Sequence, residues 1–145
     1  MSLFNLLSVS ASGMSAQRLR AELLVENMAN AETTRTAEGG PYRRRDAVFA
    51  SQTQGSPFSG VFEEALAEPS VGVEVTEIVV DDREPELRYQ PGHPDANADG
   101  YVAFPRLNPA EEMVDLLSAS RGYQANVAAM TAVKDMIHRS LDLMR

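Results

Sequence analysis

The 145-residue sequence contains no cysteine and no tryptophan, and aromatic residues make up only 6% of it. Without cysteine the chain can form neither a disulfide nor a thiolate metal site, and it has no thiol nucleophile. No stretch approaches the ~18 apolar residues that a membrane-spanning helix needs. Residues 1–30 also lack the continuous apolar segment and cleavage site of a secretory signal. If the chain leaves the cytoplasm, we therefore expect export without a cleaved signal peptide.

Positive charge is also scarce, since the formal net charge is −8 and the acidic excess is concentrated in residues 61–112. Phosphate binding needs a positive surface, so this balance disfavours nucleic acid as a partner. The basic residues lie mainly in the N-terminal third, where Arg43, Arg44 and Arg45 form a run. We expect this run at a subunit-facing edge, in contact with the acidic middle segment of a neighbour.

A long helix is predicted over residues 109–145. Asn108 supplies a capping side chain, Pro109 occupies the first helical position, and Glu111 follows three residues after the cap. No proline interrupts the rest of the chain, and apolar residues recur at alternating steps of three and four, which is typical of a coiled-coil seam. The positions on this spacing are Met113, Leu116, Ser120, Tyr123, Val127, Met130, Lys134, Ile137, Leu141 and Met144.

A second helix, over residues 1–31, carries the same spacing at Phe4, Leu7, Ala11, Met14, Arg18, Ala21, Val25 and Met28. Gly13 within it, and the two alanines of the seam, make this helix marginal in isolation. The simplest arrangement pairs the two terminal helices with each other as one coiled-coil domain. Two ordinary amphipathic helices on a globular core would produce a similar pattern.

The segment between the helices predicts little helix. Residues 32–66 form an extended connector with one strand at about 47–51, and residues 67–108 form a small β and turn region with strands at 71–80, 87–90 and 101–104. The predicted fold class is mainly α with a small β region: long terminal helices paired as a coiled coil, with an extended connector and small antiparallel β-hairpins between them.

The loop at residues 91–100 holds the most specific run of polar residues. Asp95, Asn97 and Asp99 match the first half of a calcium-binding EF-hand loop, but Arg106 stands where the bidentate Glu should be and the flanking segments are predicted as strands. A turn in which these side chains bond backbone amides fits better, and a small calcium-binding module is the alternative. His93 lacks a nucleophile or cleft partner for general catalysis. We expect no catalytic residue, no cofactor and no metal.

Several stretches resemble a known family. Residues 10–20, Asn27 to Ala31, and Thr33-Thr34 are similar to the N-terminal helix signature of the flagellar rod and hook axial proteins. Residues 39–44, 91–102 and 111–126 further resemble proteins of the proximal rod. Two departures are visible: Glu26-Asn27 replaces the usual pair of asparagines, and residues 51–70 match nothing diagnostic.

The resemblance implies a structural, non-enzymatic rod subunit. Such proteins pass unfolded and uncleaved through the flagellar type III export apparatus and assemble in the periplasm, with their terminal helices packed around a central channel. Implied partners are further copies of the chain and the rod proteins FlgB and FlgF, with the MS ring and FliE nearby. A soluble helical adaptor or secretion chaperone is the alternative. The seam and the matching motifs give the expected assembly residues: Met14, Val25, Asn27, Met28, Asn30, Met113, Leu116, Tyr123, Gln124, Asn126, Val127, Met130, Ile137 and Leu141.

Overall fold

Two helices and two small antiparallel sheets make up the protein, which we describe from a computed structural model covering residues 3–53 and 71–143. The elements follow in the order α1 (Leu3–Ala29), β1 (Arg45–Thr53), β2 (Val71–Val80), β3 (Glu86–Tyr89), β4 (Tyr101–Phe104) and α2 (Pro109–Asp142). The predicted fold class is therefore confirmed as mainly helical with a small β part. Neither helix in this part of the chain is long and apolar enough to cross a membrane.

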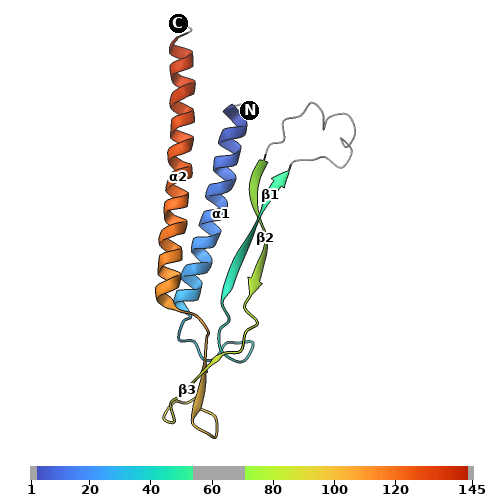
Figure 1. The fold of residues 1–145 in the computed structure, drawn as a ribbon, viewed down its shortest axis with the longest axis vertical. Coiled ribbons are helices and arrows are strands. Elements are labelled where there is room, and N and C mark those ends of the chain that lie inside the picture. The colour runs from blue at the N-terminus through green and yellow to red at the C-terminus, as the bar shows by residue number, and fades with distance from the viewer. Residues whose placement is uncertain (1–2, 54–70, 144–145) are drawn as a thin grey trace, which may run out of the picture.

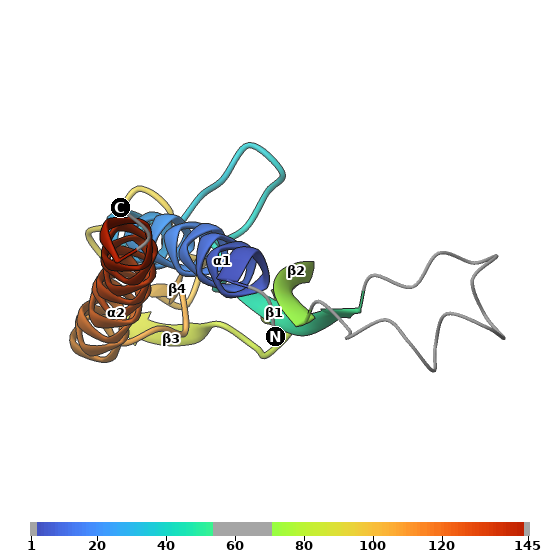
Figure 2. The same cartoon turned by 90° about the horizontal axis from the view of Figure 1, so that it is seen from above.

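The elongated shape of the molecule comes from the helices, which run antiparallel beside each other (Figure 1). Viewed from above, α1 lies between α2 and the β1–β2 hairpin (Figure 2), and both strands of the hairpin contact α1. The loops after α1 and the β3–β4 hairpin form a foot below the helices, from which β4 leads into α2. One helix is thus packed on two sides, while α2 is packed mainly on one.

The start of α2 forms as its sequence predicts. The side chain of Asn108 accepts a hydrogen bond from the Ala110 amide at 3.0 Å, and Pro109 stands at the first position, where its missing N–H has no partner to lose. Although α2 is 34 residues long, its buried residues within the described chain are Glu112, Ala119 and Val133. A helix with so little buried apolar surface gains little stability from its own subunit.

The β1–β2 hairpin takes one of its strands from the predicted connector. β1 extends over residues 45–53, beyond the expected 47–51, and pairs along its whole length with β2, with a bulge between Val48 and Phe49. An isolated two-stranded hairpin is marginally stable, so its packing on α1 matters. Ser12 of α1 makes this attachment specific: its hydroxyl accepts from the Val73 amide at 3.1 Å and donates to the Val9 carbonyl at 2.9 Å.

The β3–β4 hairpin closes through a turn-rich loop, as expected. The Asn97 Oδ1 accepts from the amides of Asp99 (3.0 Å) and Tyr101 (2.8 Å), and Gly100 adopts a φ of +82°. The carboxylate of Asp95 accepts from the Thr34 hydroxyl at 2.8 Å. The side-chain oxygens of Asp95 and Asn97, which a calcium loop would use as metal ligands, thus accept hydrogen bonds within the protein. The loop also joins two strands rather than two helices.

Candidate assembly surface

The seam between α1 and α2 is built from polar and small residues. Asn27 meets Glu112 at the lower end of the seam, Gln17 faces Gly122 near its middle, and Gly13 faces Asn126 higher up. Between the contacts of Asn27 and Gln17, the guanidinium of Arg20 lies 3.5 Å from the carboxylate of Asp115. Larger apolar residues, Leu23, Leu24 and Val133, are also buried on the two helices, but none of them is a predicted seam position.

The two glycines let the helices approach closely. A Cβ added at Gly13 would lie 3.0 Å from the Asn126 Oδ1, and a Cβ at Gly122 would lie 3.2 Å from the Gln17 Cδ. The Asn126 amide is held in place by donating to the Gly122 carbonyl at 2.9 Å. Any larger residue at these positions would have to push a neighbouring side chain away, so the glycines are explained by the seam rather than by helix propensity.

Asn27 is fully buried and all its hydrogen-bonding groups are used. Its amide nitrogen donates to the Arg45 carbonyl and to the Glu112 Oε2, each at 3.0 Å. Its Oδ1 accepts from the Tyr42 hydroxyl at 2.9 Å and from the Arg45 amide at 3.0 Å. A single side chain of α1 therefore connects the first residue of β1, the loop before it and the first turn of α2.

Glu112 brings a buried carboxylate into the same cluster. Its side chain is 2% exposed, and its second oxygen, Oε1, accepts from the Arg44 guanidinium. Arg44 also pairs with Asp46 at 2.6 Å and lies 3.8 Å from Asp115. Burial opposes the charge of Arg44, but these carboxylates outweigh it and raise the pKa of the guanidinium. The guanidinium of Arg44 therefore stays charged across the physiological range. We call Asn27, Tyr42, Arg44 and Glu112 the polar cluster.

The arginine run forms ion pairs within its own subunit, and its expected contact with the acidic segment of a neighbour stays a prediction. Arg43 pairs with Asp82 at 2.9 Å, and Arg45 pairs with Glu26 at 2.9 Å. The sequence places these arginines far from their acidic partners, and only the fold brings them together. The pair between Arg45 and Glu26 also gives the departure at residue 26 a structural role, because a glutamate there can bind the first residue of β1.

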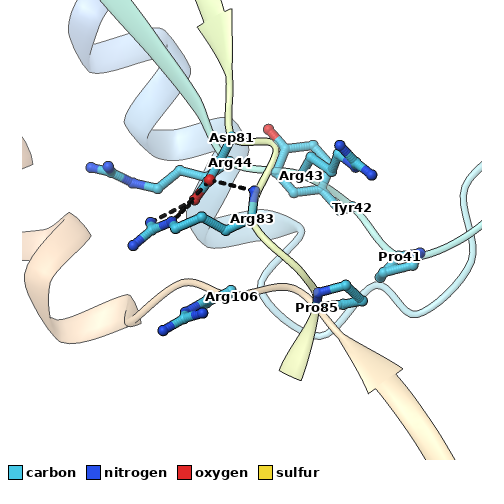
Figure 3. A pocket seen from close by; sticks show the side chains of 8 residues that line it. All are labelled: Pro41, Tyr42, Arg43, Arg44, Asp81, Arg83, Pro85 and Arg106. Carbon is cyan, nitrogen blue, oxygen red and sulfur yellow. Dashed lines mark hydrogen bonds and ion pairs between the residues drawn. The ribbon is translucent and has the colours of Figure 1, made fainter. Parts of the chain in front are cut away.

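A small basic pocket lies next to the polar cluster, between the loops of the foot (Figure 3). Asp81 points toward Arg83 there, and the guanidinium and backbone amide of Arg83 bind its carboxylate. These hydrogen bonds, with the charges of Arg83 and Arg44, lower the pKa of Asp81 to about 2. The pocket holds about 10 Å³, roughly one water molecule. The pocket therefore has no room for a ligand larger than water.

The predicted seam positions lie one residue away from the side chains that the structure brings together. Contacts are made at positions 13, 17 and 27 rather than 14, 18 and 28, and at 112, 122 and 126 rather than 113, 123 and 127. One residue corresponds to about 100° around a helix, so the apolar stripes stand beside the seam. The predicted apolar assembly residues that are exposed are Val25 (52%), Met113 (54%), Tyr123 (42%), Val127 (42%) and Leu141 (53%).

The two stripes converge on a groove beside the seam. This groove has a volume of about 490 Å³ and is walled by Gln17, Arg18 and Ala21 of α1 and by Leu116, Leu117, Ala119, Ser120 and Tyr123 of α2. Five of these residues belong to the predicted stripes. In an antiparallel pair, the positions that follow the contact residues fall on the same side of both helices, which explains why the two stripes meet there.

The remaining predicted residues divide by burial. Asn27 is buried within the polar cluster, and Gln124 is exposed. Asn126, which contacts Gly13, is half-buried. Six further predicted residues in the helices or just after α1 are also half-buried: Met14, Met28, Asn30, Leu116, Met130 and Ile137. The sequence prediction missed Glu112, whose type gave no apolar signal, and Tyr42. It also missed the buried Leu24 and Val133, each of which lies next to a predicted position.

Comparisons with known proteins identify relatives over the full length of the chain. The family model described as "Flagellar basal body rod FlgEFG protein C-terminal" matches residues 98–143. The flagellar basal-body rod protein FlgC of Bacillus subtilis is 41% identical over 99% of both chains. FlgC of Borreliella burgdorferi is 38% identical over 100% of this chain and 99% of its own. FlgC of Salmonella typhimurium is 34% identical over 99% of this chain and 98% of its own.

Proposed function

This chain belongs to the FlgC family of flagellar basal-body rod proteins and is a structural subunit of that rod, and we propose that it polymerises there through the outer faces of its terminal helices. The apolar stripes and the groove between them are the proposed contact surface. Its partners are further copies of the chain and the rod proteins FlgB and FlgF, with the MS ring and FliE nearby.

The observation that carries this proposal is the placement of the apolar residues. Within the subunit, the seam uses Asn27, Gln17 and two glycines, while Val25, Met113 and Val127 remain 42–54% exposed. Exposed apolar residues aligned along two helices are typical of an interaction surface. Head-to-tail contacts of such a surface build a helical assembly when the rotation between copies does not close.

The proposal extends to how the subunit reaches the rod. A helix such as α2, with few buried residues, depends on neighbours for its order, and this suits passage through the type III export apparatus in an unfolded state. We place the assembled subunit in the periplasmic part of the basal body, around the export channel in the proximal rod. In the assembly, neighbouring helices would complete a coiled-coil packing that the isolated pair makes only in part.

The test is the substitution Val127→Asp in the native bacterium. Because Val127 is 42% exposed and outside the seam, the charge should leave the unfolding of the purified chain unchanged. It should nevertheless abolish incorporation into purified basal bodies, and motility with it, because the interface would have to bury a charge. Val127→Leu, which keeps the surface apolar, is the matched control, and bacteria that carry it should have normal motility.

Two outcomes would contradict the proposal. Normal motility of Val127→Asp would remove the stripe from the assembly surface. Mass spectrometry that found the wild-type chain only in the cytosol, and not in basal bodies, would favour the adaptor.

A further inference from the structure

The polar cluster has a feature that stability alone does not explain. Buried ion pairs with their hydrogen bonds contribute little net stability compared with well-packed apolar residues, but they accept only one arrangement of their partners. In coiled coils, a single buried asparagine fixes the alignment of the helices in this way. Here a buried asparagine, Asn27, is joined by a buried carboxylate, Glu112, at the end of the seam.

From this we infer that the polar cluster is a register lock, which fixes the alignment of α1, α2 and β1 and thereby keeps the apolar stripes turned outward. Its donors and acceptors match only in the observed alignment. If α2 slid by one turn, Glu112 would lose both Asn27 and Arg44, and Asn27 would lose one acceptor while its other bonds held it to Arg45.

The rest of the seam agrees with one alignment. The facing residues Asn27 and Glu112, Gln17 and Gly122, and Gly13 and Asn126 follow a single antiparallel register, since the two numbers of each pair add up to 139. The glycines are needed only where they face these particular side chains. A slide of four residues in one direction would bring Met130 opposite Gly13 and Asn126 opposite Gln17. A slide of three residues in the other direction would bring Tyr123 and Ala119 to the same two contacts.

The neighbouring apolar stripes offer an alternative packing that the lock opposes. Met14, Val25 and Met28 on α1, with Met113, Tyr123 and Val127 on α2, lie on a seven-residue repeat and are apolar, so they can pair with each other in more than one alignment. Turning the two helices toward each other would bury these stripes within the subunit and remove the surface from which neighbours could bind. The lock opposes this rotation. The rotation would leave the Glu112 carboxylate and the Asn27 amide buried without hydrogen-bond partners, which they have only in the present alignment.

The absence of cysteine allows a direct test by engineered disulfides in the purified full-length chain. Gln17→Cys with Gly122→Cys reports the observed register, because a Cβ at position 122 lies 3.4 Å from the Gln17 Cγ. Gln17→Cys with Asn126→Cys, or with Ala119→Cys, reports a slide of one turn in either direction. Each pair is oxidised and the yield of intramolecular disulfide is measured by mass spectrometry.

The lock is then replaced as a unit by apolar residues, Asn27→Leu, Tyr42→Phe, Arg44→Met and Glu112→Leu, so that no side chain of the cluster is left without its partner. We expect the variant to retain its helix content by circular dichroism. The disulfide yield of the pair at 17 and 122 should fall by about tenfold, and the disulfide yield of the shifted pairs should rise. The control, Arg20→Leu, removes the seam pair with Asp115, whose two side chains are more than one-third exposed, and keeps the Asp115 carboxylate beside Arg44; it should leave the register unchanged.

An unchanged yield at 17 and 122 in the apolar variant would overturn the inference, because the register would then be fixed elsewhere. Loss of helix content would overturn it too, since the cluster would then be a source of stability rather than of alignment. Both results are obtained on the isolated chain, so they are independent of whether the stripes bind neighbours in the rod.

Discussion

Removing the Glu112 carboxylate alone should destabilise the protein far more than removing an exposed acid. In Glu112→Ala, Arg44 keeps Asp46 and Asp115 but loses its buried partner, and the Asn27 amide loses one of its two acceptors. Breaking a buried pair costs about 3–5 kcal/mol. Because the Arg44 side chain is 25% exposed and keeps other carboxylates, we expect a cost at or just below the lower limit of that range, about 2–3 kcal/mol.

The comparison variant is Glu22→Ala, which removes the exposed pair with Arg18, whose side chains are 56% and 76% exposed. Pairs of this type on a helix surface contribute little to stability because solvent screens them. Urea unfolding of the purified chains, followed by circular dichroism, gives both free energies of unfolding. If Glu112→Ala lost less than about 1 kcal/mol, or no more than Glu22→Ala, the cluster would not be the buried network described here.

Two further perturbations test the seam and the foot. Gly13→Leu should cost about 1–3 kcal/mol, since even a Cβ would lie 3.0 Å from the Asn126 Oδ1, and adding Asn126→Ala should recover part of the loss in the same urea assay. Asp81, whose pKa is lowered to about 2, contributes stability that is present above its unfolded value of about 4 and is lost as the pH falls toward 2. Asp81→Asn should therefore flatten the decrease in unfolding free energy between pH 4 and 2, and an unchanged pH profile would show that this pair does not contribute.

Local signals in the sequence predicted the elements well, because capping, proline and alternation act over a few residues. Asn108 and Pro109 placed the start of α2, and β2 and β4 occupy the predicted ranges 71–80 and 101–104. β1 is longer than predicted because its polar ends pair with valines of β2, at Thr53 with Val71 and at Asp46 with Val79. Pairing to a distant strand decides such ends, and a local pattern does not contain that information.

The polar cluster could not be predicted for a different reason. Asn27, Tyr42, Arg44 and Glu112 come from α1, a loop and α2, and Asn27 is separated from Glu112 by 85 positions. Nothing in their local sequence distinguishes a buried glutamate from the exposed ones that surround it in this acidic chain. The motif around Asn27 was recognised only through the family resemblance, which gave no role for the side chain.

The periodicity of the helices identified an apolar face correctly but not what that face contacts. In a monomeric protein the apolar stripe of a helix faces its own core, and the prediction of mutual pairing rested on that rule. In this subunit the contacts within the chain use the adjacent face. The same seven-residue repeat would arise whether the partner helix belongs to the same copy or to another, so the sequence of one chain contains no means of separating the two.

The exposed apolar residues allow an estimate of the free energy that neighbouring subunits can contribute to the stability of the helices. Burying a large apolar side chain completely stabilises by about 1.5–3 kcal/mol, so covering the exposed half of one is worth about 1 kcal/mol. The five exposed stripe residues Val25, Met113, Tyr123, Val127 and Leu141 would together supply about 5 kcal/mol per subunit. This equals the lower end of the stability of a whole domain. The order of the helices is therefore expected to depend on subunit concentration, and they should resist thermal unfolding more strongly in basal bodies than in the isolated chain.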